Sequence, residues 1–413
     1  MNMVAERDES KFFIPDHVPR DMIHPFDLFA DADIRHSPFD ATQKMRGYGR
    51  VFWNPANPLF KGSWVLTEAR DLRYVLSNPE LFCSKGDAGF MTQGDTLELI
   101  PLELDPPRHG KFRQLLNPLI TPAIVSNMTH GVTQKAVELI DAVADKGECD
   151  FMKDFALPFP VSIFMQLMGL PESETETFLG WVVALVQTGG TADDNLAMQA
   201  AAEKVAAYLT GLAAERRANP RQDIASYVAN GKIDGEPLSD KEVLGTLYML
   251  FLAGLDTVTA TLGWFFYHLA THQDHQRQLR EDPDLIPKAI EELLRRYSIV
   301  VGHRRCTRDV EVAGVAMKEG DWITVMQSMG STDPAEFEDP LAVQFERQNI
   351  RHFAFAFGPH FCMGSHLARR ELDVSLREFL ARVPQFRIKA GSQAVTHGGH
   401  TFGFDTLPLE WPA

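Results

Sequence analysis

The sequence Phe355-Ala-Phe-Gly358-Pro-His360-Phe-Cys362-Met-Gly364 places one cysteine inside a glycine-punctuated turn, and a helical run starts directly after it. Gly358 and Gly364 can adopt backbone angles that are closed to other residues, and they let a flat ligand approach closely. A helix that begins after Cys362 directs free N–H groups and the positive end of its dipole toward the sulfur. Because these influences favour thiolate over thiol, the pattern predicts a sulfur that can ligate one face of a haem iron.

The spacing of this stretch is specific. With 28 Phe, 29 Gly and 4 Cys in 413 residues, F-x-x-G-x-x-x-C-x-G is expected by chance in about one chain per thousand. The alternative is a buried structural cysteine in a tight turn. The stretch resembles the haem-ligand loop of the cytochrome P-450 monooxygenases, with one departure at Ala356, where the family usually has a further glycine. The resemblance implies that Cys362 ligates the iron of haem b and that Phe355, His360 and Gly364 lie against the cofactor.

The composition is that of one large globular unit. Of the residues, 45% are hydrophobic and 23% are charged, which is typical of a soluble protein with a large core. No Gly/Ser-rich, Pro-rich or single-charge block interrupts the chain, so we expect residues 1–413 to form a single haem-thiolate monooxygenase domain. The net charge of −16 argues against nucleic acid as a partner.

Cysteine usage and the N-terminal sequence indicate the compartment. The four cysteines are scattered, without a C-x-x-C pair, so neither a disulfide framework nor a zinc site is predicted. Such sparse usage is typical of the reducing cytoplasm. Residues 1–13 contain neither the apolar core of a signal peptide nor a membrane anchor. We therefore expect a cytoplasmic protein without a membrane partner, similar to the soluble bacterial members of the family.

The resemblance implies a mainly α protein, in which a large helical domain with small β-sheets surrounds a buried haem. Residues 1–48 have no clear period and predict an irregular segment. Short strands are expected at 50–53 and 63–66, on either side of a Pro/Gly turn. Further strands are expected at 309–314 and 321–325, joined by a turn.

A series of helices is predicted between residues 122 and 230, where breakers divide the helical patterns. The resemblance makes residues 171–215 the lid over the pocket. Later, Ser239 and Glu242 have capping-box spacing and open an almost wholly apolar helix that runs to about His268. Asp256 in its middle makes a membrane span expensive, so a core helix is the better prediction.

Inside this helix lies Ala253-Gly254-Leu-Asp256-Thr257, an acid and an alcohol among apolar residues. The Thr257 hydroxyl can donate to the carbonyl of residue 253 and bend the helix. A carboxylate in such surroundings needs a reason; one alternative is a buried basic partner. The resemblance implies the family's oxygen-activation motif, in which a break in the helix holds O2, Thr257 steadies it and Asp256 relays protons from solvent.

Two basic clusters match the family's contacts to the haem propionates. His109 and Arg113 are four residues apart and share one helix face; the alternative is a solvated basic turn. Arg304 stands three residues before Thr307 and matches a second propionate ligand, whereas Arg305 is expected to be a surface charge. A guanidinium suits a carboxylate because it can donate two parallel hydrogen bonds.

Glu292 and Arg295 form an E-x-x-R pair, a spacing that is commonplace on solvated helices. The resemblance joins this pair to Arg347 in a later irregular segment. We expect the three residues to lock the scaffold behind the haem, so that loss of one partner harms folding before chemistry.

The chain resembles the soluble bacterial camphor-hydroxylating branch most closely. That branch holds its ketone substrate with a tyrosine, where this chain has Leu97, and residues 88–104 contain no tyrosine. Met249, Leu252 and Val300 are the other expected substrate contacts. Because a discriminating hydrogen-bond donor is missing, we expect a bulky, mostly apolar terpenoid or norisoprenoid substrate and weak binding of camphor.

The expected reaction is hydroxylation of a C–H bond with O2 and two electrons. No nicotinamide or flavin domain fits in the chain, so the resemblance implies a [2Fe-2S] ferredoxin as the electron donor, itself fed by a ferredoxin reductase. Arg73, Lys111 and Arg113 are candidates for its docking site. Two alternatives are a peroxide-driven or reductase-type haem-thiolate enzyme and a non-enzymatic haem sensor or carrier.

Overall fold

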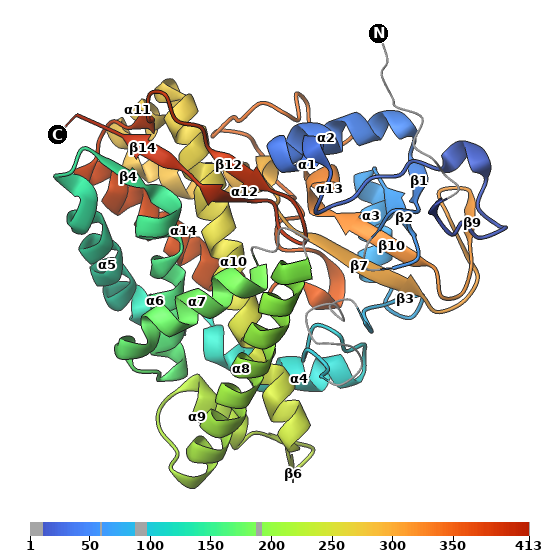
Figure 1. The fold of residues 1–413 in the computed structure, drawn as a ribbon, viewed down its shortest axis with the longest axis horizontal. Helices are drawn as coiled ribbons and strands as arrows, with labels where there is room; N and C mark the ends of the chain where they lie inside the picture. The colour runs from blue at the N-terminus through green and yellow to red at the C-terminus, as the bar shows by residue number, and fades with distance from the viewer. Residues whose placement is uncertain (1–10, 58–59, 87–96, 187–191, 413) are drawn as a thin grey trace.

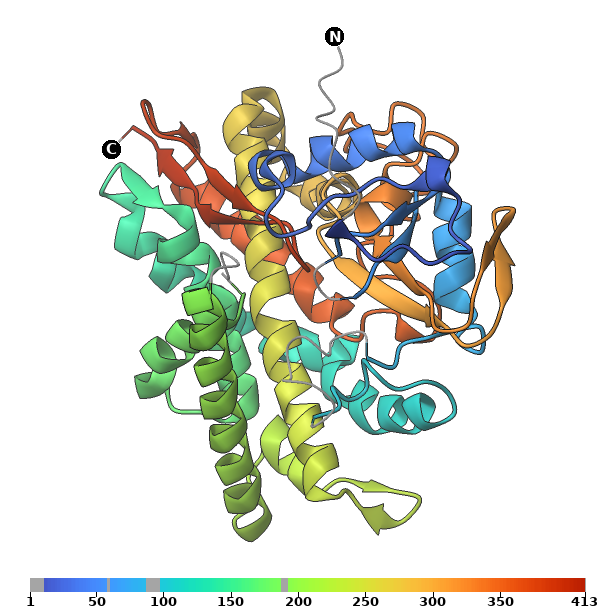
Figure 2. The same cartoon turned by 45° about the vertical axis from the view of Figure 1, so that its right-hand side comes forward.

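The computed structural model describes residues 11–57, 60–86, 97–186 and 192–412 (Figure 1). Helix α10 (Asp240–Thr271) runs through the middle of the molecule, with a helical part on one side and a strand-rich part on the other (Figure 2). The mainly α fold with small sheets is thus confirmed.

The largest sheet has five strands in the order β1-β2-β10-β7-β3. The β2–β10 pair is parallel and the other pairs are antiparallel. Two strands predicted from the sequence are confirmed as the neighbours β1 and β2. The strands of this sheet are β1 (Val51–Asn54), β2 (Ser63–Leu66), β3 (Phe82–Cys83), β7 (Val301–Cys306) and β10 (Trp322–Met326).

The other strands form smaller sheets. β4, β11 and β14 make one sheet, and β5–β6, β8–β9 and β12–β13 are two-stranded pairs. Their bounds are β4 (Glu148–Asp150), β5 (Lys232–Ile233), β6 (Glu236–Pro237), β8 (Val310–Val312), β9 (Val315–Met317), β11 (Arg387–Ile388), β12 (Val395–His397), β13 (Gly403–Thr406) and β14 (Pro408–Glu410).

Helices pack around α10 on both sides, and α5 lies beside α14 in both views (Figures 1 and 2). Their bounds are α1 (Ala32–His36), α2 (Pro38–Met45), α3 (Ala69–Ser77), α4 (Arg108–Leu116), α5 (Pro122–Ala144), α6 (Pro158–Met168), α7 (Thr175–Val186), α8 (Ala192–Ala218), α9 (Ile224–Ala229), α11 (Gln273–Glu281), α12 (Ile286–Arg296), α13 (Gln327–Ser331) and α14 (Ser365–Arg382).

Two local predictions are wrong. The segment 1–48, predicted to be irregular, contains α1 and α2; Asp31 caps α1 by accepting from the Asp33 N–H, and Pro38 starts α2. The strands at 309–314 and 321–325 do not pair with each other. Instead β8 turns back on β9 through Ala313 and Gly314, both at positive φ, while β10 joins the large sheet.

Helix α10 begins as predicted and continues further than predicted. The Ser239–Glu242 capping box is confirmed, and the Thr257 hydroxyl donates to the Ala253 carbonyl at 3.0 Å. The helix is not broken at the motif, and the bend expected from this hydrogen bond stays a prediction. By length and composition α10 could cross a membrane, but most of its apolar window is buried inside the protein, as expected for a core helix.

Two apolar clusters meet along α10. Its first half, up to Leu255, packs into one cluster with α6 to α9, and its second half, from Val258, packs into the other with the sheet and α14. Asp256 and Thr257 therefore lie at the boundary between the two clusters.

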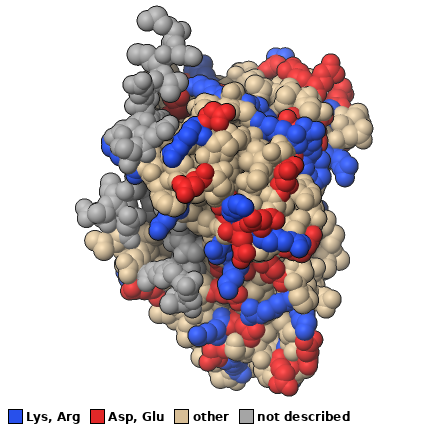
Figure 3. Space-filling view, turned by 90° about the vertical axis from the view of Figure 1, so that its right-hand side faces the viewer, with Lys and Arg blue, Asp and Glu red and all other residues tan. Residues whose placement is uncertain are grey.

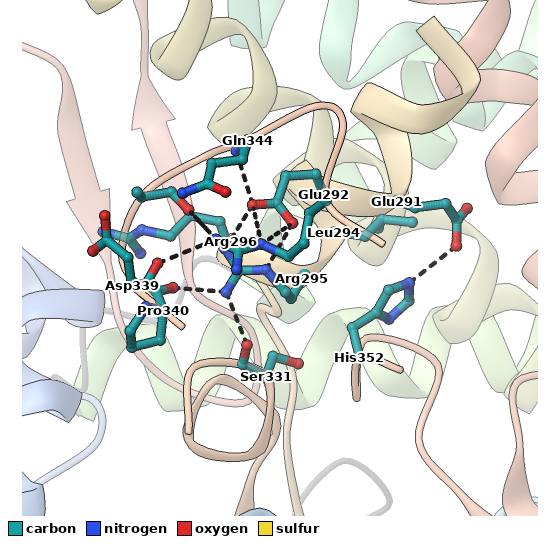
Figure 4. A network of polar contacts seen from close by, with 12 residues as sticks. Glu291, Glu292, Leu294, Arg295, Arg296, Ser331, Asp339, Pro340, Gln344 and His352 are labelled. Carbon is teal, nitrogen blue, oxygen red and sulfur yellow. Dashed lines mark hydrogen bonds and ion pairs between the residues drawn. The ribbon is translucent and has the colours of Figure 1, made fainter. Parts of the chain in front are cut away.

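Glu292 joins α12 to the irregular segment that leads toward the cysteine loop (Figure 4). Both Glu292 and Arg295 are fully buried. Arg295 donates to the two oxygens of Glu292 at 2.7 and 2.8 Å, and Arg347 Nε donates to one of them at 3.0 Å. The Gln344 N–H also donates to this carboxylate, and Arg295 reaches the Ser331 carbonyl. One carboxylate thus pairs with two guanidinium groups.

We predict that Glu292→Ala lowers the free energy of unfolding by about 3–5 kcal/mol, because it leaves a buried guanidinium uncompensated. Thermal unfolding of the variant checks this. The matched control is Glu281→Ala, which removes an exposed ion pair to Arg280 and should change stability by less than about 1 kcal/mol. Equal stability of the two variants would show that the buried network does not hold the scaffold.

Three histidines pack where α10 ends and α11 begins. His268 is buried, its Nδ1 lies 2.9 Å from the Tyr297 hydroxyl, and its Nε2 lies 2.8 Å from His275 Nδ1. The His272 ring stacks on it at 4.1 Å. Burial, then the neighbouring His272, His275 and Arg296, lower the pKa of His268 to about 2. The folded protein therefore holds this imidazole neutral.

This lowered pKa predicts acid sensitivity with a defined sign. The neutral imidazole stabilises the fold fully above the ordinary pKa of 6.5, and that stability is lost as the pH falls below it, because only the unfolded chain takes up the proton. Each pH unit costs up to about 1.4 kcal/mol. The midpoint temperature of thermal unfolding should decrease as the pH is lowered from about 6.5 to about 5. This decrease should be less steep in His268→Gln. A His130→Gln control, at an exposed site, should keep the wild-type slope.

Candidate active site

The cysteine loop is held by backbone hydrogen bonds on both sides of the sulfur. The Cys362 N–H donates to the Phe355 carbonyl at 2.9 Å. From α4, Arg113 Nη1 donates to the Phe361 carbonyl at 2.8 Å. Phe355 is buried, whereas the Cys362 side chain is accessible. A Cβ built on Gly364 would lie 3.9 Å from the Cys362 sulfur. The loop therefore presents the sulfur without covering it.

The loop needs two left-handed residues. Gly358 has φ +70°, and a Cβ there would lie 2.3 Å from the Leu76 carbonyl oxygen. Ala356 has φ +56°, the region that glycine adopts without cost and that other residues pay about 1–2 kcal/mol to enter. The departure from the family pattern therefore leaves the backbone course of the loop intact and adds local strain.

The surroundings of Cys362 act on its pKa in opposite directions. Burial raises the pKa of the thiol, while the N–H groups of Gly364 and Ser365 and the charges of Arg113 and Arg369 lower it. The helix start and the two arginines thus act in the predicted direction, toward the thiolate, and against the effect of burial. A coordinated metal ion would further favour the thiolate.

The middle turn of α10 supplies an acid and an alcohol. Ala253 is exposed, and Asp256 and Thr257 are half-buried, on a helix that is otherwise mostly covered. The Thr401 hydroxyl donates to Asp256 Oδ2 at 2.5 Å. Burial raises the pKa of Asp256, opposed by this hydrogen bond and by the nearby His397. Among the described residues, the hydrogen-bond partner of the acid is thus a hydroxyl rather than the buried basic residue that was the alternative.

The predicted propionate ligands come together in the structure. His109, on α4, is buried, and the centroid of its ring lies 4.2 Å from the centroid of the His360 ring. His360 Nε2 in turn forms a hydrogen bond with the Ser84 hydroxyl at 3.0 Å. Burial, then Arg113 and Arg304, lower the pKa of His109 to about 4.

One atom of this cluster tests whether a haem fits. His109 Nε2 is buried and has no hydrogen-bond partner among the described residues, although buried polar atoms are nearly always paired. The field of two guanidinium groups, Arg113 and the buried Arg304, reaches the same ring. A carboxylate group placed here would satisfy the imidazole and the charges together. The donors fit a haem whose iron is held by Cys362.

The four predicted substrate residues are all half-buried. Leu97, Met249 and Leu252 pack against the first apolar cluster of α10, and Val300 packs against the second. They therefore come from both sides of the boundary that Asp256 marks. Residues 88–96, part of the stretch noted for its lack of tyrosine, lie outside the described residues, as does part of the predicted lid.

The sequence reasoning missed Thr401, which is 145 residues away from the acid it contacts. No local pattern in the sequence marks this threonine. The only available signal is Asp256 itself, since a buried carboxylate requires a partner.

Comparison with known proteins agrees with this geometry. The family model "Cytochrome P450" matches residues 32–394. A probable cytochrome P450 127A1 from Sinorhizobium fredii is 42% identical over 405 residues, covering 96% of this chain and 97% of the relative. A steroid C26-monooxygenase from Mycobacterium tuberculosis is 31% identical over 389 residues, covering 92% and 96%.

Solved structures give the same result. The crystal structure of cytochrome P450 CYP101C1 superimposes with a TM-score of 0.88 at 32% identity, covering 97% of this chain and all of that one. The family predicted from the cysteine loop is thereby confirmed. With a family model across most of its length and relatives that match it nearly end to end, the chain belongs to the cytochrome P450 family of haem b oxidoreductases.

Proposed function

We propose that this cytochrome P450 is a cytoplasmic monooxygenase that hydroxylates a small, mostly apolar terpenoid or norisoprenoid. The observation that carries the proposal is the pairing of an accessible cysteine with an acid–alcohol turn on α10. The electrons come from a [2Fe-2S] ferredoxin and its reductase. A peroxide-driven enzyme or a haem sensor has no comparable use for a buried acid beside an alcohol.

Each polar residue has a role that follows from its place. Cys362 holds the iron, and His109, Arg113 and Arg304 bind the carboxylate groups of the cofactor. When bound, haem supplies the activation of O2 and the attack on the C–H bond. Asp256 holds a proton at its carboxyl group, which its raised pKa favours, and Thr257 orients a hydroxyl into the same space. The apolar walls exclude water.

The apolar character of the substrate rests on the side chains around the acid. Leu97 stands where a tyrosine would donate a hydrogen bond to a ketone, and Met249, Leu252 and Val300 are apolar. A site without a discriminating donor selects by shape and rejects related molecules only weakly. Bulky apolar compounds are therefore the proposed substrate class.

The docking site for the electron donor centres on Arg113, whose guanidinium touches the cysteine loop directly. The other two candidates are partly neutralised: Lys111 pairs with Asp234, and Arg73 pairs with Glu336 at 2.8 Å and packs over Phe353. Basic and acidic side chains are also interspersed over the face in Figure 3. We therefore propose that the ferredoxin docks where the path for electrons to the Cys362 sulfur is short, and that a uniformly basic surface matters less.

Replacement of the cysteine tests the haem-thiolate assignment. We predict that Cys362→Ser loses the absorption band of thiolate-ligated haem in the reduced, carbon monoxide-bound protein and loses hydroxylation, with an unchanged far-ultraviolet circular dichroism spectrum. Cys83→Ser, on the edge strand β3, serves as the control and should keep both. A Cys362→Ser protein with the wild-type band would overturn the assignment.

The substrate class is tested by ligand titration of the ferric protein, following the spin-state change. An ionone-type ketone should bind more tightly than camphor. Leu97→Tyr should raise the affinity for camphor up to about tenfold, since one neutral hydrogen bond contributes about 1 kcal/mol, whereas Leu97→Phe should not. Tight and complete camphor conversion by the wild type would contradict the proposed class.

A further inference from the structure

The C-terminal hairpin β12–β13 packs beside helix α10 (Figure 2), and hydrogen bonds fix the loop between its two strands. The Val301 N–H donates to the His400 carbonyl at 2.8 Å, and the Phe402 N–H donates to the Ile299 carbonyl at 3.0 Å. Trp264 Nε1, from α10, donates to the Phe402 carbonyl at 2.8 Å. The backbone on both sides of Thr401 is therefore fixed.

This fixation determines where the Thr401 hydroxyl points. Thr401 is buried and bridges to Val300, a predicted substrate contact. Its hydroxyl donates to Asp256 Oδ2 at 2.5 Å, which holds the carboxyl group on the hairpin side of α10. The other carboxyl oxygen is left to exchange a proton.

His397, in the same hairpin, packs against α10 about one helical turn after Asp256. A Cβ built on Gly403 would lie 2.6 Å from His397 Nε2 and 3.3 Å from the Ala260 Cβ. Two small residues thus make room for the imidazole against the helix. Ala260 is four residues after Asp256 and shares its face, so His397 and Asp256 neighbour each other along one side of α10.

The two nitrogens of His397 differ. Nδ1 lies 2.7 Å from Asp405 Oδ1 and donates to that carboxylate, whereas Nε2 is buried and has no partner among the described residues. Such an atom in a folded protein usually bonds to an ordered water. The side chains are 35% exposed at Asp405 and 17% exposed at His397. Polar groups therefore lead inward from solvent to the acid.

We propose that His397, oriented by Asp405, is the group through which solvent protons reach Asp256, and that Thr401 is the positioning residue that holds Asp256 beside it. The inference rests on the proton-holding role proposed for Asp256. In the transfer, the N–H bond at Nε2 of the His397 imidazolium breaks, one bridging water passes the proton on, and an O–H bond forms on the Asp256 carboxylate. The Nδ1–H stays bonded to Asp405, a solvent proton then adds back at Nε2 through the same water, and no electrons move.

The test uses the haem-loaded enzyme with an ionone-type ketone, a [2Fe-2S] ferredoxin and its reductase. Turnover, the share of electrons lost to hydrogen peroxide, the solvent isotope effect on kcat and the dissociation constant of the ketone are measured. We expect Thr401→Val and His397→Gln to lower kcat about tenfold or more and to raise the peroxide share and the isotope effect. Binding of the ketone should change less than about twofold, because neither change removes apolar contact area.

Matched variants separate position from packing. Thr401→Ser keeps the hydroxyl and should restore most of the wild-type behaviour. Thr396→Val removes a hydroxyl from the same hairpin that donates to the Arg35 carbonyl instead, and it should behave as wild type. A second readout needs no turnover: the imidazole resonances of His397, assigned by loss in His397→Gln, should shift in Asp256→Asn and not in Thr396→Val.

The outcomes distinguish the two levels of the proposal. If Asp256→Asn has the kcat of the wild type and loses the same share of electrons to hydrogen peroxide, the role proposed for Asp256 is wrong. If Asp256→Asn is impaired while His397→Gln and Thr401→Val match Thr396→Val, the hairpin path is wrong and the acid is fed from elsewhere. A defect in Thr401→Val without one in His397→Gln overturns the path as well and leaves only the positioning role.

Discussion

Helix α10 buries many apolar side chains in both clusters and still carries a carboxyl group in its middle. Each large apolar side chain that it buries contributes about 1.5–3 kcal/mol, so the helix is a main source of stability for both apolar clusters. An unpartnered carboxyl group at the same depth would cost several kcal/mol. The structure resolves this by placing Asp256 at the boundary of the two clusters and giving it the Thr401 hydroxyl. At this boundary the carboxyl group of the site is satisfied by a residue from the C-terminal hairpin.

The cysteine loop is held in place by two adjacent carboxylates of α12. Glu292 holds the irregular segment before the cysteine loop through Arg347. Glu291 holds the helix after the loop through Arg369, at 2.6 Å, and Arg369 in turn packs over Phe355 at 4.4 Å. These pairings keep the pKa of Glu291 at about 2. Both ends of the loop are thus tied to one helix, which lets the loop itself tolerate the strained Ala356.

What the sequence could predict follows from how far apart the interacting residues are. The capping box of α10, the Thr257 back-bond and the Glu292–Arg295 pair lie within a turn or two of one helix, and each was predictable. The short helices α1 and α2 and the β8–β9 pair were not, because a few residues carry too little periodic signal. The contact between Asp256 and Thr401 spans 145 residues, and only the fold brings it about.

The side of α10 on which the acid is held has a consequence for catalysis. An acid bonded to a covering helix would change its surroundings whenever that helix moved to admit a substrate. Asp256 is bonded instead to a hairpin whose backbone is fastened to residues 299–301 and to Trp264. Among the described residues, the hydrogen bond that holds its carboxyl group therefore comes from the hairpin and not from α7 or α8.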